Sequence, residues 1–212
     1  MQAGTQVIAR SIVGDHDDQS EDRSRRPVDR QAAETAVAAL LTALGVQPGS
    51  EVALNTPRRV AAAFEEMLTA PKFNPTTFAV DQVQQDLVLA RNVPFRSVCA
   101  HHLLPFVGMA QVGYLPGSRI LGLSKFARVV DMFARGLQVQ EELTRQVADW
   151  VDAELGARGA AVVITAEHLC MTARGVRAAG TSASTVAWRG AFRHDAAARA
   201  EFLAAIQTGT PA

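Results

Sequence analysis

Two short segments hold most of the cysteine and histidine in this chain, and they restrict how it can fold. The 212 residues include only two cysteines and five histidines. Cys99 is followed by His101 and His102, and much later in the chain His168 stands two positions before Cys170. Cys99 and His102 have a C-x-x-H spacing, which lets two side chains reach one ion from a tight turn. If Cys170 is a third ligand, the fold must bring two distant segments together.

Two thiolates and one imidazole suit Zn²⁺, which binds sulfur and nitrogen tetrahedrally. A structural site needs a fourth protein ligand, whereas a catalytic site leaves that position to water. His101 and His168 are the candidates for a fourth protein ligand. Alternation along an extended segment predicts that His101 points away from His102, and that His168 lies on the same side as Cys170, free to act as an acid or base. The alternative is that both cysteines are buried apolar residues without a metal.

Basic residues gather at a few places that could bind phosphate. In "GLSKFAR", the residues Ser124, Lys125 and Arg128 stand at the start of a predicted helix. Amide groups at a helix start, a hydroxyl and two cations form a phosphate site. Further arginines occur in "TPRRV" and "TARGVR", namely Arg58, Arg59, Arg174 and Arg177. Taken alone, each of these side chains is better explained as a solvated charge; the phosphate hypothesis depends on their occurring in several clusters.

Composition excludes some classes of partner. Acidic and basic residues balance at 21 each, so no overall field attracts nucleic acid or a membrane surface. No apolar run approaches the length of a membrane span, and the N-terminus lacks the apolar core of a secretory signal. We therefore expect a cytoplasmic protein with reduced cysteines.

The hydrophobic pattern divides the chain into three parts. Residues 1–29 are polar and charge-mixed, which predicts a flexible arm. Residues 30–70 predict two helices, one that ends at Gly45 and one that begins with Thr56 as N-cap and Pro57 in the first turn. Residues 85–212 form the core of the domain at 30–212. They begin with two extended pieces broken near Pro94 and a strand in "VGMAQVGYLP".

Two helices follow in the core, the first with Ser124 as a candidate cap. The segments "GAAVVITAEH" and "TSASTVAWRGAF" then predict two strands, and "DAAARAEFLAAIQ" predicts a final helix. The order strand, strand, helix, helix, strand, strand favours an α+β fold with an antiparallel sheet.

Taken together, the motifs resemble the GTP cyclohydrolase I family. The similar segments are "TPRRV", "SVCAHHLLPF", "VGYLP", "GLSKFARVV", "QVQEELT", "AEHLCMTARGVR" and "STVAWRGAF", within roughly residues 31–207. The resemblance implies the tunnelling fold, in which ββααββ subunits join through their sheets into an oligomeric barrel. It also implies a homo-oligomer, commonly a decamer of two pentamers, with active sites between subunits.

The resemblance further implies a zinc-dependent hydrolase that opens the imidazole ring of GTP at C8. The products would be formate and 7,8-dihydroneopterin triphosphate. Cys99, His102 and Cys170 match the zinc ligands, and His101 and His168 match the catalytic histidines. The matching substrate-binding residues are Glu141 and Gln140 for guanine, Ser124, Lys125, Arg128 and Arg174 for ribose and triphosphate, and Arg59 for phosphate from another subunit.

Three positions depart from the family pattern. Ala100 stands where the family has glutamate, Gly136-Leu137 replaces Arg-Pro, and Ala178-Ala179 replaces Lys-Pro. An ionised glutamate beside the ligands could orient a histidine or tune the metal. Two alternatives follow, namely a specialised paralogue that acts on a modified guanine nucleotide, and a non-catalytic zinc ring that binds nucleotide.

Overall fold

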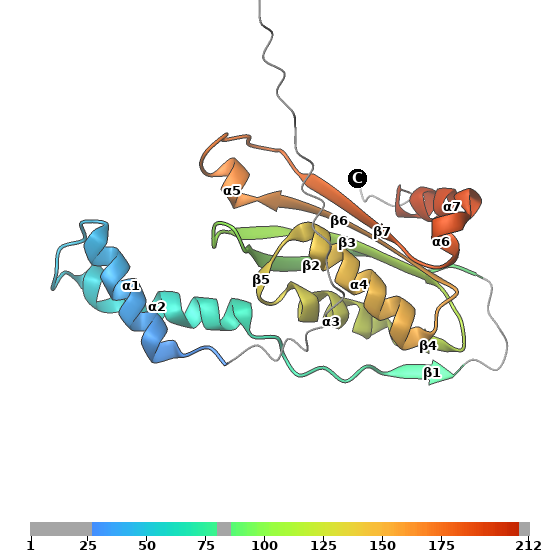
Figure 1. The fold of residues 1–212 in the computed structure, drawn as a ribbon, viewed down its shortest axis with the longest axis horizontal. Coiled ribbons are helices and arrows are strands. Elements are labelled where there is room, and N and C mark those ends of the chain that lie inside the picture. Colours follow the sequence, from blue (N-terminus) through green and yellow to red (C-terminus); the bar gives the residue numbers. More distant parts are fainter. Residues whose placement is uncertain (1–26, 80–85, 208–212) are drawn as a thin grey trace, which may run out of the picture.

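The computed structural model describes residues 27–79 and 86–207 (Figure 1). The arm expected over residues 1–29 falls outside these ranges except for its last three residues. In chain order, the elements are α1 (Arg30–Ala43), α2 (Glu51–Leu68), β1 (Thr77–Ala79), β2 (Val88–Cys99), β3 (Pro105–Leu115), β4 (Arg119–Leu121), α3 (Leu123–Ala134), β5 (Leu137–Gln138), α4 (Gln140–Leu155), β6 (Gly159–His168), α5 (Leu169–Thr172), β7 (Ala183–Trp188), α6 (Ala191–His194) and α7 (Ala196–Gln207).

A twisted sheet organises the described part of the chain. Its strand order is β5-β2-β3-β6-β7, and all neighbours are antiparallel except the two-residue β5, which runs parallel to the end of β2. The helices α3 and α4 lie across one face of this sheet (Figure 1). The short strands β1 and β4 pair separately. The predicted α+β class, with an antiparallel sheet and a helical pair between two strand pairs, is therefore confirmed.

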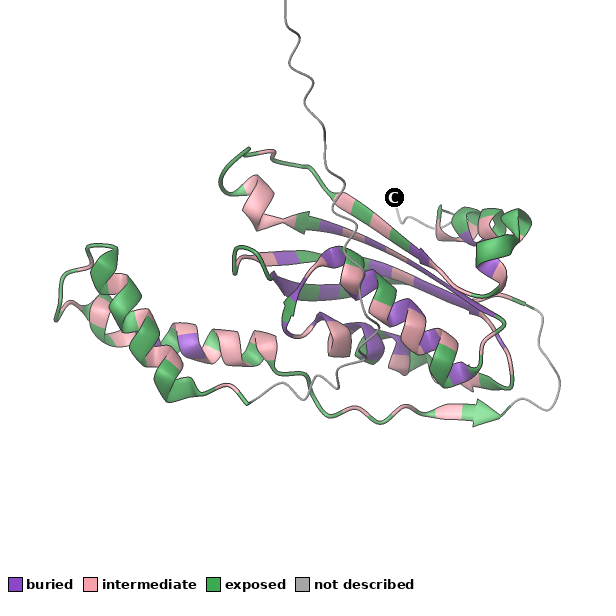
Figure 2. Cartoon of the chain, in the orientation of Figure 1, coloured by how far each residue is buried: buried purple, intermediate pink, exposed green. Residues whose placement is uncertain are grey.

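Strand β6 shows how the sequence pattern sets the two faces of the sheet. Val162 and Ile164 belong to the main core shared with α3 and α4, whereas Ala161 packs with Phe202 of α7 on the opposite face. Alternation along a strand requires this division. A side chain on Gly113, which pairs with Ala161, would come within 2.8 Å of the Phe202 ring, so this position has room only for glycine. Buried residues accordingly concentrate in the sheet and the helices against it (Figure 2).

The two leading helices form a hairpin that extends away from the sheet (Figure 1). No residue of α1 is buried across Arg30–Ala43 (Figure 2). Large apolar side chains on the hairpin are exposed, namely Leu40, Leu44, Val52 and Leu54. The prediction that the second helix begins at Thr56 was wrong. Ser50 caps it instead by accepting a bond from the Ala53 amide at 3.2 Å. Pro57 therefore lies inside the helix, where the Ala53 carbonyl lacks its usual donor.

Two other local predictions need correction. Strand β2 is continuous through Pro94, and its irregularity is a bulge between Ala90 and Val93, where Asn92 has φ of 53°. Proline is tolerated here because, among the described residues, β2 has only β3 beside it at this point. Ser124 does not cap α3, since the N-cap position belongs to Gly122. No described helix is long and apolar enough to cross a membrane.

Candidate metal centre and active site

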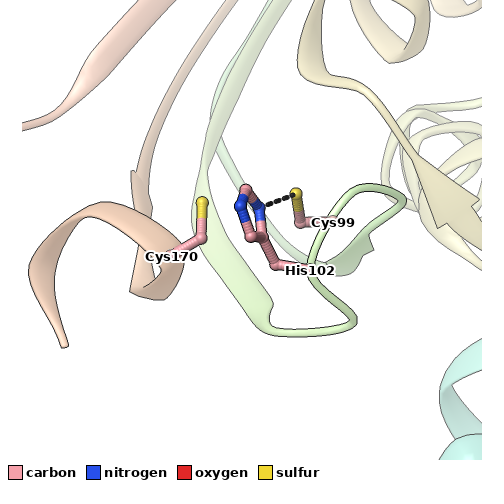
Figure 3. Close-up of side chains that lie close together, drawn as sticks. All are labelled: Cys99, His102 and Cys170. Atoms are coloured by element: carbon pink, nitrogen blue, oxygen red, sulfur yellow. Dashed lines mark hydrogen bonds between the residues drawn. The ribbon is translucent and has the colours of Figure 1, made fainter. Parts of the chain in front are cut away.

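The structure brings Cys99, His102 and Cys170 together (Figure 3). Cys99 ends β2, and the chain then turns back sharply. The amides of His102 and Leu103 both donate to the Cys99 carbonyl, at 3.3 and 2.9 Å. Leu103 takes a left-handed conformation with φ of 56° in this turn. Cys170 arrives from the other side on the short helix α5. The three ligand atoms all lie within 4.8 Å of one another.

This donor set fits a tetrahedral zinc ion. Sulfur and nitrogen ligands bound at about 2.3 and 2.0 Å to one tetrahedral ion lie about 3.5–3.8 Å apart. Cys99 Sγ and His102 Nδ1 are 3.7 Å apart, which matches that separation. Burial, and then the neighbouring Cys99, raise the pKa of the Cys170 thiol in the metal-free protein. A bound cation would offset that cost because it stabilises both thiolates.

His168 lies beside this cluster in sequence but is held differently from the prediction. The chain becomes helical at Leu169, so Cys170 is not on the extended segment, and the alternation argument for these two residues was wrong. The His168 ring stacks on Phe106, with centroids 4.6 Å apart and planes 3° apart. Its Nε2 lies 2.7 Å from Gln140 Oε1. Burial lowers the pKa of His168, and the nearby Glu141 carboxylate partly opposes that effect.

His101 is exposed in the turn after β2, with its ring edge-on to His102 at 6.2 Å between centroids. Within the described part of the chain, the three-donor cluster includes neither His101 nor His168. The two candidates for a fourth ligand therefore both lie outside it.

Gln140 and Glu141 open α4 and face in opposite directions. Gln140 is only 3% exposed, and its amide is used by protein groups. Glu141 is exposed and lines a pocket of about 420 Å³. That pocket also contains Arg145, Val186, Ala187, Trp188, Arg189 and Arg193. Of the two residues predicted to hold guanine, Glu141 lines this pocket, whereas Gln140 is buried among protein groups.

The predicted phosphate residues occupy several elements. Ser124, Lys125 and Arg128 lie in the first half of α3. Lys125 Nζ sits 5.9 Å from the centre of the Phe73 ring, and Arg128 lines a pocket of about 340 Å³ together with Phe73 and Lys72. Arg174 is exposed in the loop after α5, and Arg59 is exposed on α2.

The start of α3 and the metal cluster lie at opposite ends of the sheet. The cluster is at the β2–β3 turn, and β4, which immediately precedes α3, lies at the far end of β3 (Figure 1). The Leu121 amide donates to the Tyr114 hydroxyl there at 2.9 Å. Helix α3 runs back from there, and Ser97, two residues before Cys99, donates to the carbonyl of Ala134 at the other end of α3. A helix of 12 residues is about 18 Å long, so Ser124 lies roughly that far from the cluster end of the sheet in its own chain.

Sequence reasoning missed both contacts that hold His168, although it named Gln140 for a different role. Phe106 faces His168 across β3 and β6, in register. Gln140 reaches it from α4. Neither contact leaves a local signal in the sequence, because each depends on elements that only the fold brings side by side.

Comparison with known proteins gives one consistent result. A family model described as GTP cyclohydrolase I matches residues 33–207. The GTP cyclohydrolase 1 of Corynebacterium glutamicum is 46% identical over 187 residues, which cover 86% of this chain and 95% of the relative. Those of Mycobacterium leprae and Mycolicibacterium gilvum are 46% and 47% identical, and they cover 85% and 82% of this chain and 91% and 89% of the relatives.

A solved structure of an archaeosine synthase QueF-Like is 23% identical and covers 49% of this chain and 93% of that chain, with a TM-score of 0.41. This likeness is too slight to support an argument. The family match and the curated relatives span most of the chain, and the chain therefore belongs to the GTP cyclohydrolase I family.

Proposed function

We propose that this protein is a zinc-dependent GTP cyclohydrolase I. In this reaction the imidazole ring of GTP opens at C8, C8 leaves as formate, and the product is 7,8-dihydroneopterin triphosphate. The observation that carries the proposal is the convergence of Cys99, His102 and Cys170 in a chain that belongs to this family. When bound by these residues, Zn²⁺ supplies a Lewis acid that makes water reactive near neutral pH.

The chain's own side chains supply the proton transfers. His168 donates a proton to N7 of the purine, which makes C8 a better electrophile. His101, two residues from the ligand Cys99, serves as the second acid or base. Glu141 accepts hydrogen bonds from the donors on the guanine edge, which adenine presents in a different pattern. The triphosphate is held by the basic residues Lys125, Arg128, Arg174 and Arg59, with Ser124 beside the ribose.

We also propose that two or more copies of the chain build each site. Ser124 stands at the end of α3 away from the metal cluster, about 18 Å along the helix from Ala134, which supports a site in which Ser124 meets the substrate of another copy. Exposed apolar residues on α1 and α2 support contact with another copy. We take the assembly to be a decamer of two pentamers in the cytoplasm, with its sheets joined into a barrel and no nucleic acid or membrane partner.

Product formation tests this proposal. Purified, zinc-loaded protein is incubated with GTP, oxidised, and assayed for fluorescent pterin, beside reactions with GDP and 8-oxo-GTP. Pterin from GTP supports the proposal. Turnover of the 8-oxo nucleotide alone would favour the specialised paralogue, and bound GTP without turnover would favour the nucleotide-binding ring. Glu141→Ala should weaken discrimination between GTP and ATP, while Glu154→Ala, on the last turn of the same helix, is the matched control.

A further inference from the structure

The side chain of Gln140 is buried at the junction of α4, β6 and β7, and its orientation is fixed by what surrounds it. Its Nε2 lies 3.0 Å from the carbonyl oxygens of both Ile164 and Ala183, and 3.1 Å from Thr185 Oγ1. Carbonyl oxygens only accept hydrogen bonds, so the two amide hydrogens must point toward them. The amide nitrogen is therefore on this side, and Oε1 is on the other.

The neighbouring hydroxyls are consistent with this orientation. Thr144 Oγ1 donates to the backbone carbonyl of Gln140 at 2.7 Å, so the hydroxyl hydrogen of Thr144 is already used. Thr185 Oγ1 lies 2.6 Å from Thr144 Oγ1, and the hydrogen between these two oxygens must come from Thr185. Thr185 therefore has no hydrogen to donate to Gln140. A flipped amide would place Oε1 against two carbonyl oxygens and a hydroxyl oxygen, which is repulsive.

The orientation of the Gln140 amide determines which ring nitrogen of His168 carries the hydrogen. Gln140 Oε1 can only accept, so the contact at 2.7 Å requires a hydrogen on His168 Nε2. In a neutral imidazole the other nitrogen, Nδ1, then carries the lone pair. The stack on Phe106, with planes 3° apart, limits rotation of the ring. Ring orientation and hydrogen position are thus both set by residues outside the metal cluster.

We propose that Gln140 is a positioning residue that fixes a hydrogen on His168 Nε2, so that Nδ1 is the atom that takes up a proton from water and delivers it to N7 of the purine. This inference rests on the proposed function for the role of His168. It replaces the role that family resemblance implies for Gln140, because every polar atom of its side chain is already bonded within the protein. Guanine selectivity then belongs to Glu141 and not to Gln140.

Kinetics with paired variants test the proposal. Gln140→Met removes every hydrogen bond of the side chain with little change in shape. In Gln140→Glu, a protonated carboxyl group still accepts from His168 Nε2 and donates to one carbonyl. Both variants lose bonds to the sheet, but only Gln140→Met loses the acceptor that keeps the hydrogen on His168 Nε2. We expect kcat to fall about 10- to 100-fold in Gln140→Met, and to be largely retained in Gln140→Glu. KM for GTP, and preference for GTP over ITP, should be unchanged in both.

Gln146→Met is the matched control, because Gln146 is on the same helix and bonds to Gln138 and Glu142 instead of a histidine. It should lose stability without the fall in kcat. A raised KM with relaxed preference for GTP in Gln140→Met would mean that Gln140 contacts guanine. Equal kcat losses in the Met and Glu variants would reduce Gln140 to a structural role. Either result overturns the proposal.

A spectroscopic measurement keeps the inference testable even if GTP is not the substrate. Solid-state NMR of ¹⁵N-histidine protein at mildly alkaline pH distinguishes protonated from unprotonated ring nitrogens, and His168→Gln identifies the signals of His168. We expect a protonated Nε2 and a bare Nδ1 in the wild type, and a mixture of tautomers in Gln140→Met. A wild-type protein with hydrogen on Nδ1 would refute the proposal.

Discussion

Replacement of Cys170 by alanine should remove the metal and the stability that the metal adds. Cys170 is the only donor of the cluster that comes from α5, while the other two come from the β2–β3 turn. A bound ion therefore joins the end of β6 to the end of β2. Without Cys170, the turn retains one thiolate and one imidazole, which is too few ligands for tight binding of zinc.

The size of the effect follows from binding linkage. A ligand that binds only the folded state adds about 2.7 kcal/mol when its free concentration is 100 times Kd. For a chain of 212 residues, each kcal/mol moves Tm by about 2–4 °C. Zinc at that concentration should thus raise the Tm of the wild type by about 5–11 °C, and should leave Tm of Cys170→Ala nearly unchanged.

Thermal unfolding with and without zinc, together with metal content of the purified protein, provides the assay. The quantity compared is the zinc-dependent increment, because alanine can also lower Tm of the metal-free protein through lost packing. Met171→Ala, on the same turn of α5, should retain the full increment. If Cys170→Ala still binds one equivalent of zinc and keeps the increment, Cys170 is not a ligand and the reasoning fails.

Three other substitutions test separate parts of the structure. His168→Ala should keep its zinc, because it is outside the donor cluster, and lose about 10²- to 10⁴-fold in kcat; normal turnover would contradict its role as proton donor. Arg174→Ala should raise KM for GTP by about 10- to 150-fold if it loses a charged hydrogen bond of about 1.5–3 kcal/mol, and an unchanged KM would remove it from the phosphate site. Phe202→Ala should reduce the free energy of unfolding by about 3–5 kcal/mol in urea titrations, because its fully buried ring packs on Gly113 and Trp188. Leu203→Ala, at an exposed position on the same helix, is the control. Equal losses in the two variants would show that packing of α7 contributes little to the free energy of unfolding.

Patterns of local origin were predictable from the sequence. The β-branched run that starts at Gly159 gave a strand with the observed bounds, because burial on both faces excludes polar residues from its interior. The predicted end of the first helix at Gly45 is also close to that observed, since α1 ends at Ala43 and Gly45 takes a left-handed conformation with φ of 84°. Errors arose where a second signal competed. Ser50 caps the second helix six residues before Thr56, the predicted cap. Strand β2 is interrupted by a bulge near Asn92, and not by the break predicted at Pro94.

The site was only partly predictable, because its parts are far apart in the chain. The C-x-x-H spacing indicated that Cys99 and His102 could share an ion, but spacing carries no information about Cys170. Cys170 was added as a third ligand because cysteine and histidine gather at only two places in the chain, and the family resemblance gave it the same role. The structure brings all three residues together. The contacts of Gln140 could not be predicted from the sequence, because a glutamine at a helix start is usually solvated. Its burial here depends on the packing of α4 against β6 and β7.

The exposed hairpin of α1 and α2 has a consequence for stability if copies of the chain assemble as proposed. Across Arg30–Ala43 nothing is buried, and the ion pair from Arg30 to Glu65 is exposed and contributes little. A helix of 14 residues with so little support is marginal by itself in water. We therefore expect this hairpin to unfold on dilution, when the copies separate, while the sheet stays folded. Helix content from far-UV circular dichroism and molecular mass from sedimentation should then fall over the same range of protein concentration.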